Sequence, residues 1–438
     1  MDSTAYLHQL FSEDWEARMR ADPLAATAYG DHRYDDRLPS ATEETYQGLQ
    51  SLQLSLQDRL RAIDPASLPP AERTNHAIFA AVLANETGRR AFRDYRMPVT
   101  RQNSFYATFL DLSQISVFVS VQDYENYVAR LRGFRQYAAE NIELMRAGIR
   151  EGMTMPRVVL AGIEKTLKPH LVTDPTASIL YEPLGRFPAA IGQGERERLS
   201  SAAQSAIRES LVPGLRDTLD FLMGEYIPSA RRSISAADLP DGAACYRTLI
   251  RYHTNLDLTP EQIHATGTSE VERIRGEMQA IIHQVGFQGD FRAFVRYLRT
   301  DPRFYVDTPL ALLKEVALVL KRMDGELPGL FQTLPRTPYG IREIPAHMAP
   351  GTTTAYYFPP TGDGMHAGVY YVNTYDLKSR PLYEIEALSL HEAVPGHHLQ
   401  IALQQELGKV PNFRRFMVGG FTAFVEGWGL YAVRLGLE

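Results

Sequence analysis

The stretch Leu388-Ser389-Leu390-His391-Glu392-Ala393-Val394-Pro395-Gly396-His397-His398-Leu399-Gln400 holds three of the chain's twelve histidines, and a glutamate follows the first of them. Zinc hydrolases need three protein ligands, an open position for water and a nearby carboxylate that takes a proton from that water. A further carboxylate, Glu426, lies 35 positions after His391. The two segments therefore contain the residue types of a zinc site, which we expect on helices of a mainly α protein.

The spacing of the histidines departs from the usual zinc helix, H-E-x-x-H, in which the two histidines share one face. On an uninterrupted helix His397 would lie about 120° from His391, and His398 would lie about 20° away but roughly 10.5 Å farther along the axis. The intervening Pro395-Gly396 is expected to interrupt the helix, because proline lacks an N–H and glycine tolerates unusual dihedral angles. A two-residue insertion then favours His397 as the second ligand, with His398 as the alternative.

Glu426 is the best candidate for the third ligand. It follows an apolar run over residues 419–425, where an unpaired carboxylate would be costly. Glycines at 427 and 429 would let other backbone or a substrate approach closely. The alternative is an ion pair with an arginine such as Arg414 or Arg434. We favour the ligand interpretation, because the histidines otherwise lack a third partner.

The rest of the chain predicts helices and one small sheet. Residues 120–150, 195–226 and 259–285 combine N-terminal capping residues or helical spacing of apolar residues, which indicates core-facing helices. Residues 338–345, 355–358 and 368–374 are short, aromatic or β-branched, and bounded by Pro and Gly, which indicates strands. A strand before the zinc helix could pair with an extended substrate, or form only a structural hairpin. We expect a helical scaffold over residues 1–334 and the sheet with the zinc-site helices over 335–438, together forming one continuous catalytic unit.

Composition excludes several classes of function. The net charge of -6 and the isoelectric point of about 6.1 argue against nucleic acid or an anionic membrane as a partner. The single cysteine, Cys245, excludes an internal disulfide, suits a reducing compartment and is expected to be a buried apolar residue. The chain shows no signal peptide and no 18-residue apolar stretch, so we expect a cytoplasmic protein. It contains no G-x-S-x-G motif and no phosphate-cradling glycine loop.

Three segments carry a resemblance to a known family. Residues 391–400 and 426–432 resemble the bacterial family catalogued as domain of unknown function 885, and residues 368–374 are similar to its tyrosine-asparagine segment. That family is grouped with the gluzincin-type metallopeptidases, related to thimet-like and angiotensin-converting-type enzymes. The resemblance implies a largely helical body around a deep channel. It also implies a zinc site whose ligands are His391, His397 and Glu426, with Glu392 as the base.

Two departures from the family pattern carry expectations. Val433 stands where relatives often have glutamate. We expect this change to affect only the surroundings of the metal ligands and not the ligands themselves. Relatives also continue past the position of Glu438 with further helices, so we expect this chain to be C-terminally short, with reduced closure of the channel.

The expected reaction is hydrolysis of peptide bonds, with short peptides as substrates and Glu392 passing the proton of water to the leaving amine. Tyr371, or its neighbour Tyr370, is expected to donate to the developing oxyanion. Asn373 is expected to bind the substrate backbone, and His398 to contact substrate if it is not a ligand. The alternatives are a zinc amidase acting on a small non-peptide amide and a non-catalytic helical scaffold.

Overall fold

The computed structural model describes residues 2–101, 103–346, 348–418 and 421–437. Contacts divide the chain into two compact units, each made of three segments. The first unit comprises Met1–Tyr246, Pro360–Ala367 and Leu407–Gly420, and the second comprises Arg247–Pro359, Gly368–Glu406 and Phe421–Glu438. This division differs from the expected boundary at residues 334 and 335, because the helix before that boundary packs against the sheet and the histidine-containing helix that follow it. Residues 419 and 420, the first two of the apolar run before Glu426, lie outside the described residues.

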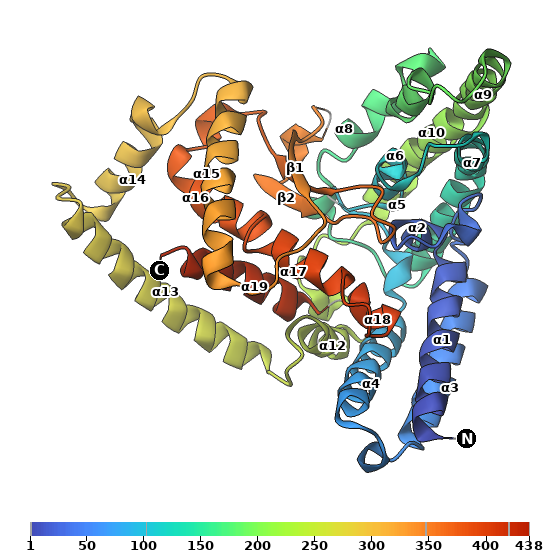
Figure 1. Ribbon diagram of the computed structural model, residues 1–438, viewed down its shortest axis with the longest axis horizontal. Coiled ribbons are helices and arrows are strands. Elements are labelled where there is room, and N and C mark those ends of the chain that lie inside the picture. Colours follow the sequence, from blue (N-terminus) through green and yellow to red (C-terminus); the bar gives the residue numbers. More distant parts are fainter. Residues whose placement is uncertain (1, 102, 347, 419–420, 438) are drawn as a thin grey trace. The chain divides into compact units, whose positions relative to one another are not determined.

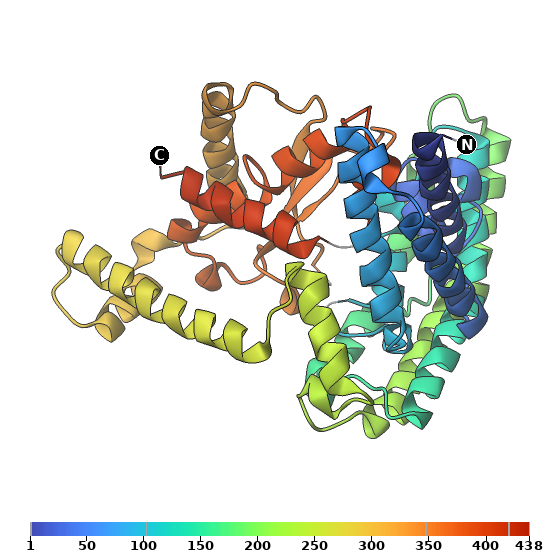
Figure 2. The same cartoon turned by 90° about the horizontal axis from the view of Figure 1, so that it is seen from below.

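The first unit is helical, and its longest helices lie side by side (Figures 1 and 2). Its helices are α1 (Ser3–Ala21), α2 (Pro23–Ala28), α3 (Glu43–Arg61), α4 (Pro70–Arg90), α5 (Phe105–Leu110), α6 (Leu112–Ile115), α7 (Val121–Arg150), α8 (Glu164–Leu167), α9 (Gln193–Ala206), α10 (Val212–Phe221), α11 (Ile227–Ser229) and α18 (Asn412–Arg415). Helix α12 (Gly242–Thr254) spans the boundary between the units.

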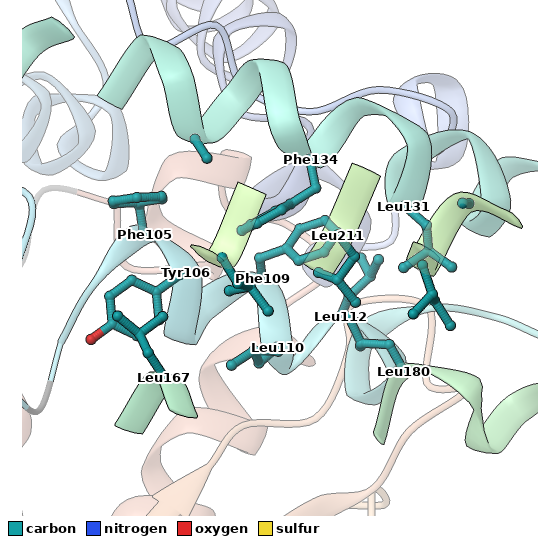
Figure 3. Close-up of a cluster of buried hydrophobic side chains, with 14 of the residues drawn as sticks. Phe105, Tyr106, Phe109, Leu110, Leu112, Leu131, Phe134, Leu167, Leu180 and Leu211 are labelled. Carbon is teal, nitrogen blue, oxygen red and sulfur yellow. The ribbon is translucent and has the colours of Figure 1, made fainter. Parts of the chain in front are cut away.

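Helix α7 organises the core of the first unit. It begins with the expected capping box, in which the Ser120 hydroxyl accepts from the Asp123 amide while the Asp123 carboxylate accepts from the Ser120 amide. Its apolar stripe, including Leu131 and Phe134, is buried against α5, α6 and α10 (Figure 3). The predicted helix over residues 195–226 is also present, as α9 and α10 with π-helical turns at Ile207–Leu211 and Leu222–Tyr226. Each π turn directly precedes a segment with proline at its second residue, where an amide donor is missing.

Short helix α18 returns to the first unit late in the chain and packs on its N-terminal helices. The ring of Phe413 lies 5.0 Å from that of Phe11 and 5.2 Å from that of Phe79. The next aromatic residue, Phe416, stacks on Trp15 at 5.6 Å. Residues at opposite ends of the sequence therefore complete one apolar surface of this unit.

The second unit combines helices with a three-stranded sheet. Its elements are α13 (Pro260–Gln284), α14 (Phe291–Thr300), α15 (Pro309–Leu330), β1 (Tyr339–Glu343), β2 (Ala355–Phe358), β3 (Gly368–Val372), α16 (Leu382–Glu392), α17 (His397–Gln405) and α19 (Thr422–Leu435). All three strands fall on the segments predicted to be extended, and α13 begins with the expected capping box of Thr259 and Gln262. The predictions of a mainly helical protein and a small sheet are thus confirmed.

The sheet has the strand order β1-β3-β2, with β1 parallel and β2 antiparallel to β3. Successive side chains of β3 alternate between two apolar clusters, as the twofold periodicity of a strand requires. Tyr370 and Val372 pack with α15, α16 and α17, whereas Val369 and Tyr371 pack in the other cluster with Ile344. The face that carries Tyr370 therefore supports the histidine-rich helix. Among the described residues, no helix is long and apolar enough to cross a membrane.

Candidate metal centre

The helix that carries the histidines is interrupted where the sequence predicts. Helix α16 ends at Glu392 and α17 begins at His397, with Pro395 and Gly396 between them. Gly396 allows two parts of the backbone to pack closely, because a Cβ at this position would lie 1.9 Å from the His391 carbonyl oxygen. Its dihedral angles, φ -75° and ψ -128°, lie outside both the helical and the extended regions, so the expectation of unusual dihedral angles at this glycine is confirmed.

The kink and α19 gather the three expected ligands. Glu426 Oε2 lies 3.3 Å from His391 Nε2 and 3.7 Å from His397 Nε2, and one donor atom from each residue falls within 4.8 Å of the others. Donors about 2.0–2.2 Å from one tetrahedral ion lie roughly 3.3–3.6 Å apart. Two imidazoles and a carboxylate are the donor set that zinc prefers. The residues therefore fit a zinc ion in type and spacing.

Helix α19 is held against the kink by Trp428 and Gly429. The indole Nε1 of Trp428 donates to the Pro395 carbonyl oxygen at 2.8 Å. A Cβ at Gly429 would lie 2.7 to 2.9 Å from three atoms of the His391 ring, so only glycine leaves room for this imidazole. Glu426, one turn earlier, has a side chain that is 54% exposed. The expectation that its carboxylate is buried in an apolar run is therefore wrong, and its pairing with the histidines is what distinguishes it.

Substituting Gly429 tests whether this packing sets the ligand geometry. Gly429→Ala should lower zinc affinity by about 10–100-fold, the effect of losing a contact that orients a metal ligand. The reason is that the added methyl group would displace the His391 ring. Gly427→Ala is the matched control on the same helix, since a Cβ there meets no atom within 4 Å. Competition with a chromophoric chelator measures both affinities. Equal affinities in the two variants would contradict this role of Gly429.

His398 points to a different set of partners. Its Nδ1 lies 2.8 Å from the Tyr357 hydroxyl, and its ring packs 4.7 Å from that of Tyr339. Burial lowers the pKa of His398 to about 4, so the ring is neutral near pH 7. It is 1% exposed and lies outside the group of candidate ligands, so the structure does not bring it to the candidate metal centre as the alternative ligand or as a substrate contact. His398 is a core residue that fixes strand β2 to helix α17.

Glu392 is placed beside the ligand group but is not part of it. The residue is 9% exposed and lines the same pocket as His391. Burial first, and then the negative charge of Glu426, raises the pKa of Glu392 to about 7, while the backbone amide of Tyr357 lowers it by less. A carboxyl group whose pKa lies near neutral pH can both accept and return a proton. This is the property that a general base next to the site needs.

Tyr371 belongs to β3, and Asn373 follows directly after this strand. Tyr371 stacks on Tyr356 at 4.9 Å, in the cluster on the sheet face away from α16, so the structure does not bring this predicted oxyanion donor to the candidate metal centre. Asn373 is fully buried, donates to the carbonyl oxygens of Ala349 and Thr353, and accepts from the Tyr375 amide. These bonds use its amide group within the loop, and its contact with substrate stays a prediction.

Tyr370 faces the kinked helix but is packed in the core. It is 0% exposed, its hydroxyl makes no hydrogen bond of good geometry among the described residues, and burial raises its pKa. The nearby Ser389 hydroxyl lowers that pKa by less, and Glu392 adds a smaller upward contribution. Tyr370 therefore lies in the core close to Glu392, and its role as the alternative oxyanion donor stays a prediction.

The sequence reasoning missed two residues that shape the site. Tyr357 binds His398 through its hydroxyl and approaches Glu392 through its amide, and Trp428 fixes the kink. Gly368 makes room for the first of these, since a Cβ there would lie 2.3 Å from the Tyr357 hydroxyl. The aromatic residue between the two glycines at 427 and 429 was a signal for Trp428, but no local pattern indicates the partner of Tyr357.

Comparisons with known proteins agree on family and fold. The model of the family "Bacterial protein of unknown function (DUF885)" matches residues 23–438. The crystal structure of a "putative lipoprotein" from Colwellia psychrerythraea is similar with a TM-score of 0.89 at 22% identity, covering 100% of this chain and 78% of that chain. A second, a "putative lipoprotein of unknown function" from Shewanella oneidensis, gives 0.61 at 16% identity, covering 98% and 77%. No curated protein matches the sequence.

Proposed function

The chain belongs to the bacterial family of domain of unknown function 885, and from that premise we propose that it is a zinc-dependent hydrolase of peptide bonds. The observation that carries this proposal is the convergence of His391, His397 and Glu426, with the buried carboxyl of Glu392 beside them. The grouping of the family with gluzincin-type metallopeptidases, and the deep channel of such enzymes, are part of the same proposal.

The chain's own residues have distinct roles in this mechanism. His391, His397 and Glu426 would hold the ion, which when bound supplies a Lewis acid and lowers the pKa of bound water. Glu392 accepts the proton of the attacking water and transfers it to the leaving amine nitrogen. Its raised pKa suits both transfers near neutral pH. Buried Tyr370, on the sheet face that packs with α16, excludes water from that side of Glu392.

A peptide is favoured over a small amide by the position of β2. This strand is at an edge of the sheet, and the amide of its Tyr357 approaches Glu392. The backbone of an edge strand can pair with an extended substrate chain, which would place a scissile bond next to the base. A compact amide has no extended backbone, so a zinc amidase would not use the edge of β2 to bind its substrate.

Metal analysis combined with a turnover assay tests the proposal. Purified protein dialysed against zinc should retain about one ion per chain, as expected for a three-ligand site. It should cleave peptides from a mixed library, detected by mass spectrometry, and a chelator should stop cleavage until zinc is restored. Less than roughly one ion per ten chains after dialysis would favour the non-catalytic scaffold. Cleavage of acylated amino acids without cleavage of peptides would favour the amidase.

The cellular location is a separate proposal. The two structural neighbours are described as "putative lipoproteins". This description supports a location in the cell envelope as the alternative to the cytoplasmic location expected from the sequence. Fractionation of native cells, with antibody detection, distinguishes the two locations.

A further inference from the structure

A pocket opens beside the candidate metal centre within the second unit. Its volume is about 430 Å³, and α16 supplies most of its wall. Glu384, Leu388 and His391 follow at helical intervals of four and three residues, so they lie along one face of α16. The same pocket reaches Glu392. It therefore extends from the proposed reacting position toward the N-terminal end of this helix.

The side chains that form the wall of this pocket favour the binding of a positively charged group. Among the described residues, its ionisable lining side chains other than His391 and Tyr383 are the carboxylic acids Glu384 and Glu392, and none of them is a lysine or arginine. Tyr383, next to Glu384, is 42% exposed and packs edge-on against Phe304 at 5.5 Å. A carboxylate beside an aromatic ring is a common arrangement for binding an ammonium or guanidinium group.

Resting on the proposed function, we propose that this pocket binds the cationic side chain of a lysine or arginine in a peptide substrate, with Glu384 as its counter-charge. Seven residues separate Glu384 from His391, a rise of about 10.5 Å along the helix. An extended peptide covers this distance in about three residues. The cationic residue therefore lies within about three positions of the scissile bond, and Glu384 acts on specificity without contacting the reacting atoms.

Arg299, on α14, supports a competing interpretation. Burial is the main cause of the raised pKa of Tyr383, and the charge of Glu384 raises this pKa further, whereas the charge of Arg299 lowers it. If Arg299 dominated, the pocket would prefer an acidic side chain. The two outcomes are opposite in sign, so a single panel of substrates separates them.

The test compares peptides that differ only by lysine, norleucine or glutamate at each position within three residues of the scissile bond. With zinc-loaded protein, we expect lysine at one position to raise kcat/KM about 5–10-fold over norleucine, the effect of a partly exposed ion pair. Glu384→Gln should remove this difference, so that the lysine and norleucine peptides are cleaved with equal kcat/KM. Glu386→Gln, on the same helix but outside the pocket, is the matched control and should keep the preference.

A binding measurement separates failure of this inference from failure of the hydrolase proposal. Fluorescence anisotropy with labelled lysine, norleucine and glutamate peptides uses the Glu392→Gln protein, alone and combined with Glu384→Gln. Tighter binding of the lysine peptide that requires Glu384 supports the pocket even if the wild-type protein cleaves no peptide. The proposal that the pocket binds a cationic side chain is overturned if the three peptides are cleaved and bound equally well, or if the glutamate peptide is preferred.

Discussion

Replacing Glu392 by glutamine should abolish turnover, lowering kcat by at least about 10³-fold, while zinc content stays near that of the wild-type protein. Glutamine keeps the shape of the side chain but cannot accept the proton of the attacking water. The three expected ligands are untouched by the change. Zinc analysis and single-turnover kinetics on the same preparation measure the two quantities. Activity within tenfold of wild type would remove Glu392 from the mechanism.

The same variant should be more stable than wild type when both are metal-free. Folding raises the pKa of Glu392 from 4.5 to about 7, so the folded state binds the proton more tightly than the unfolded state. The wild-type protein therefore has its full stability below about pH 4.5 and loses part of it as pH rises through about 7. Glutamine, which stays neutral, avoids this loss. Denaturant titrations should show a gain of roughly 3 kcal/mol at pH 8 and under about 1 kcal/mol at pH 5. An inactive variant that is also less stable at pH 8 would point to misfolding instead.

The second large effect is a contrast between the two adjacent histidines. His397→Ala should lower zinc affinity by at least about 100-fold, because it removes one of three ligands. His398→Phe should keep zinc affinity within about threefold and instead destabilise the fold by roughly 1–3 kcal/mol, since the buried Tyr357 hydroxyl loses its partner. Isothermal titration with zinc and chemical denaturation report the two effects independently. Loss of zinc in the His398 variant alone would reassign the second ligand.

Local chemistry explains why the main elements could be predicted from the sequence. The capping box at Ser120 and the apolar stripe of α7 act over one helix, and the Pro395-Gly396 break acts within a few residues. The three strands were recognisable from their aromatic residues between Pro and Gly. These signals need no knowledge of the rest of the fold.

The parts that could not be predicted depend on contacts between distant segments. The face of β3 that carries Tyr371 is decided by which side of the sheet α16 covers, so the choice between Tyr370 and Tyr371 could not be made locally. The sequence around His398 does not show that its Nδ1 forms a hydrogen bond with the hydroxyl of Tyr357, which lies 41 residues earlier. The division into two units also depends on distant contacts, because α15 packs onto α16 and β1, which follow the expected boundary in the sequence.

The late return of α18 to the first unit has a consequence for synthesis on the ribosome. Phe11 and Phe79 emerge early, yet Phe413, whose ring packs against both, is translated only after residues 247–406 of the second unit. Phe413 follows Phe79 by 334 positions (413 minus 79), which takes about 17–67 s at 5–20 residues per second. During that time the nascent N-terminal helices present an uncovered aromatic surface, which is the kind of surface that chaperones bind.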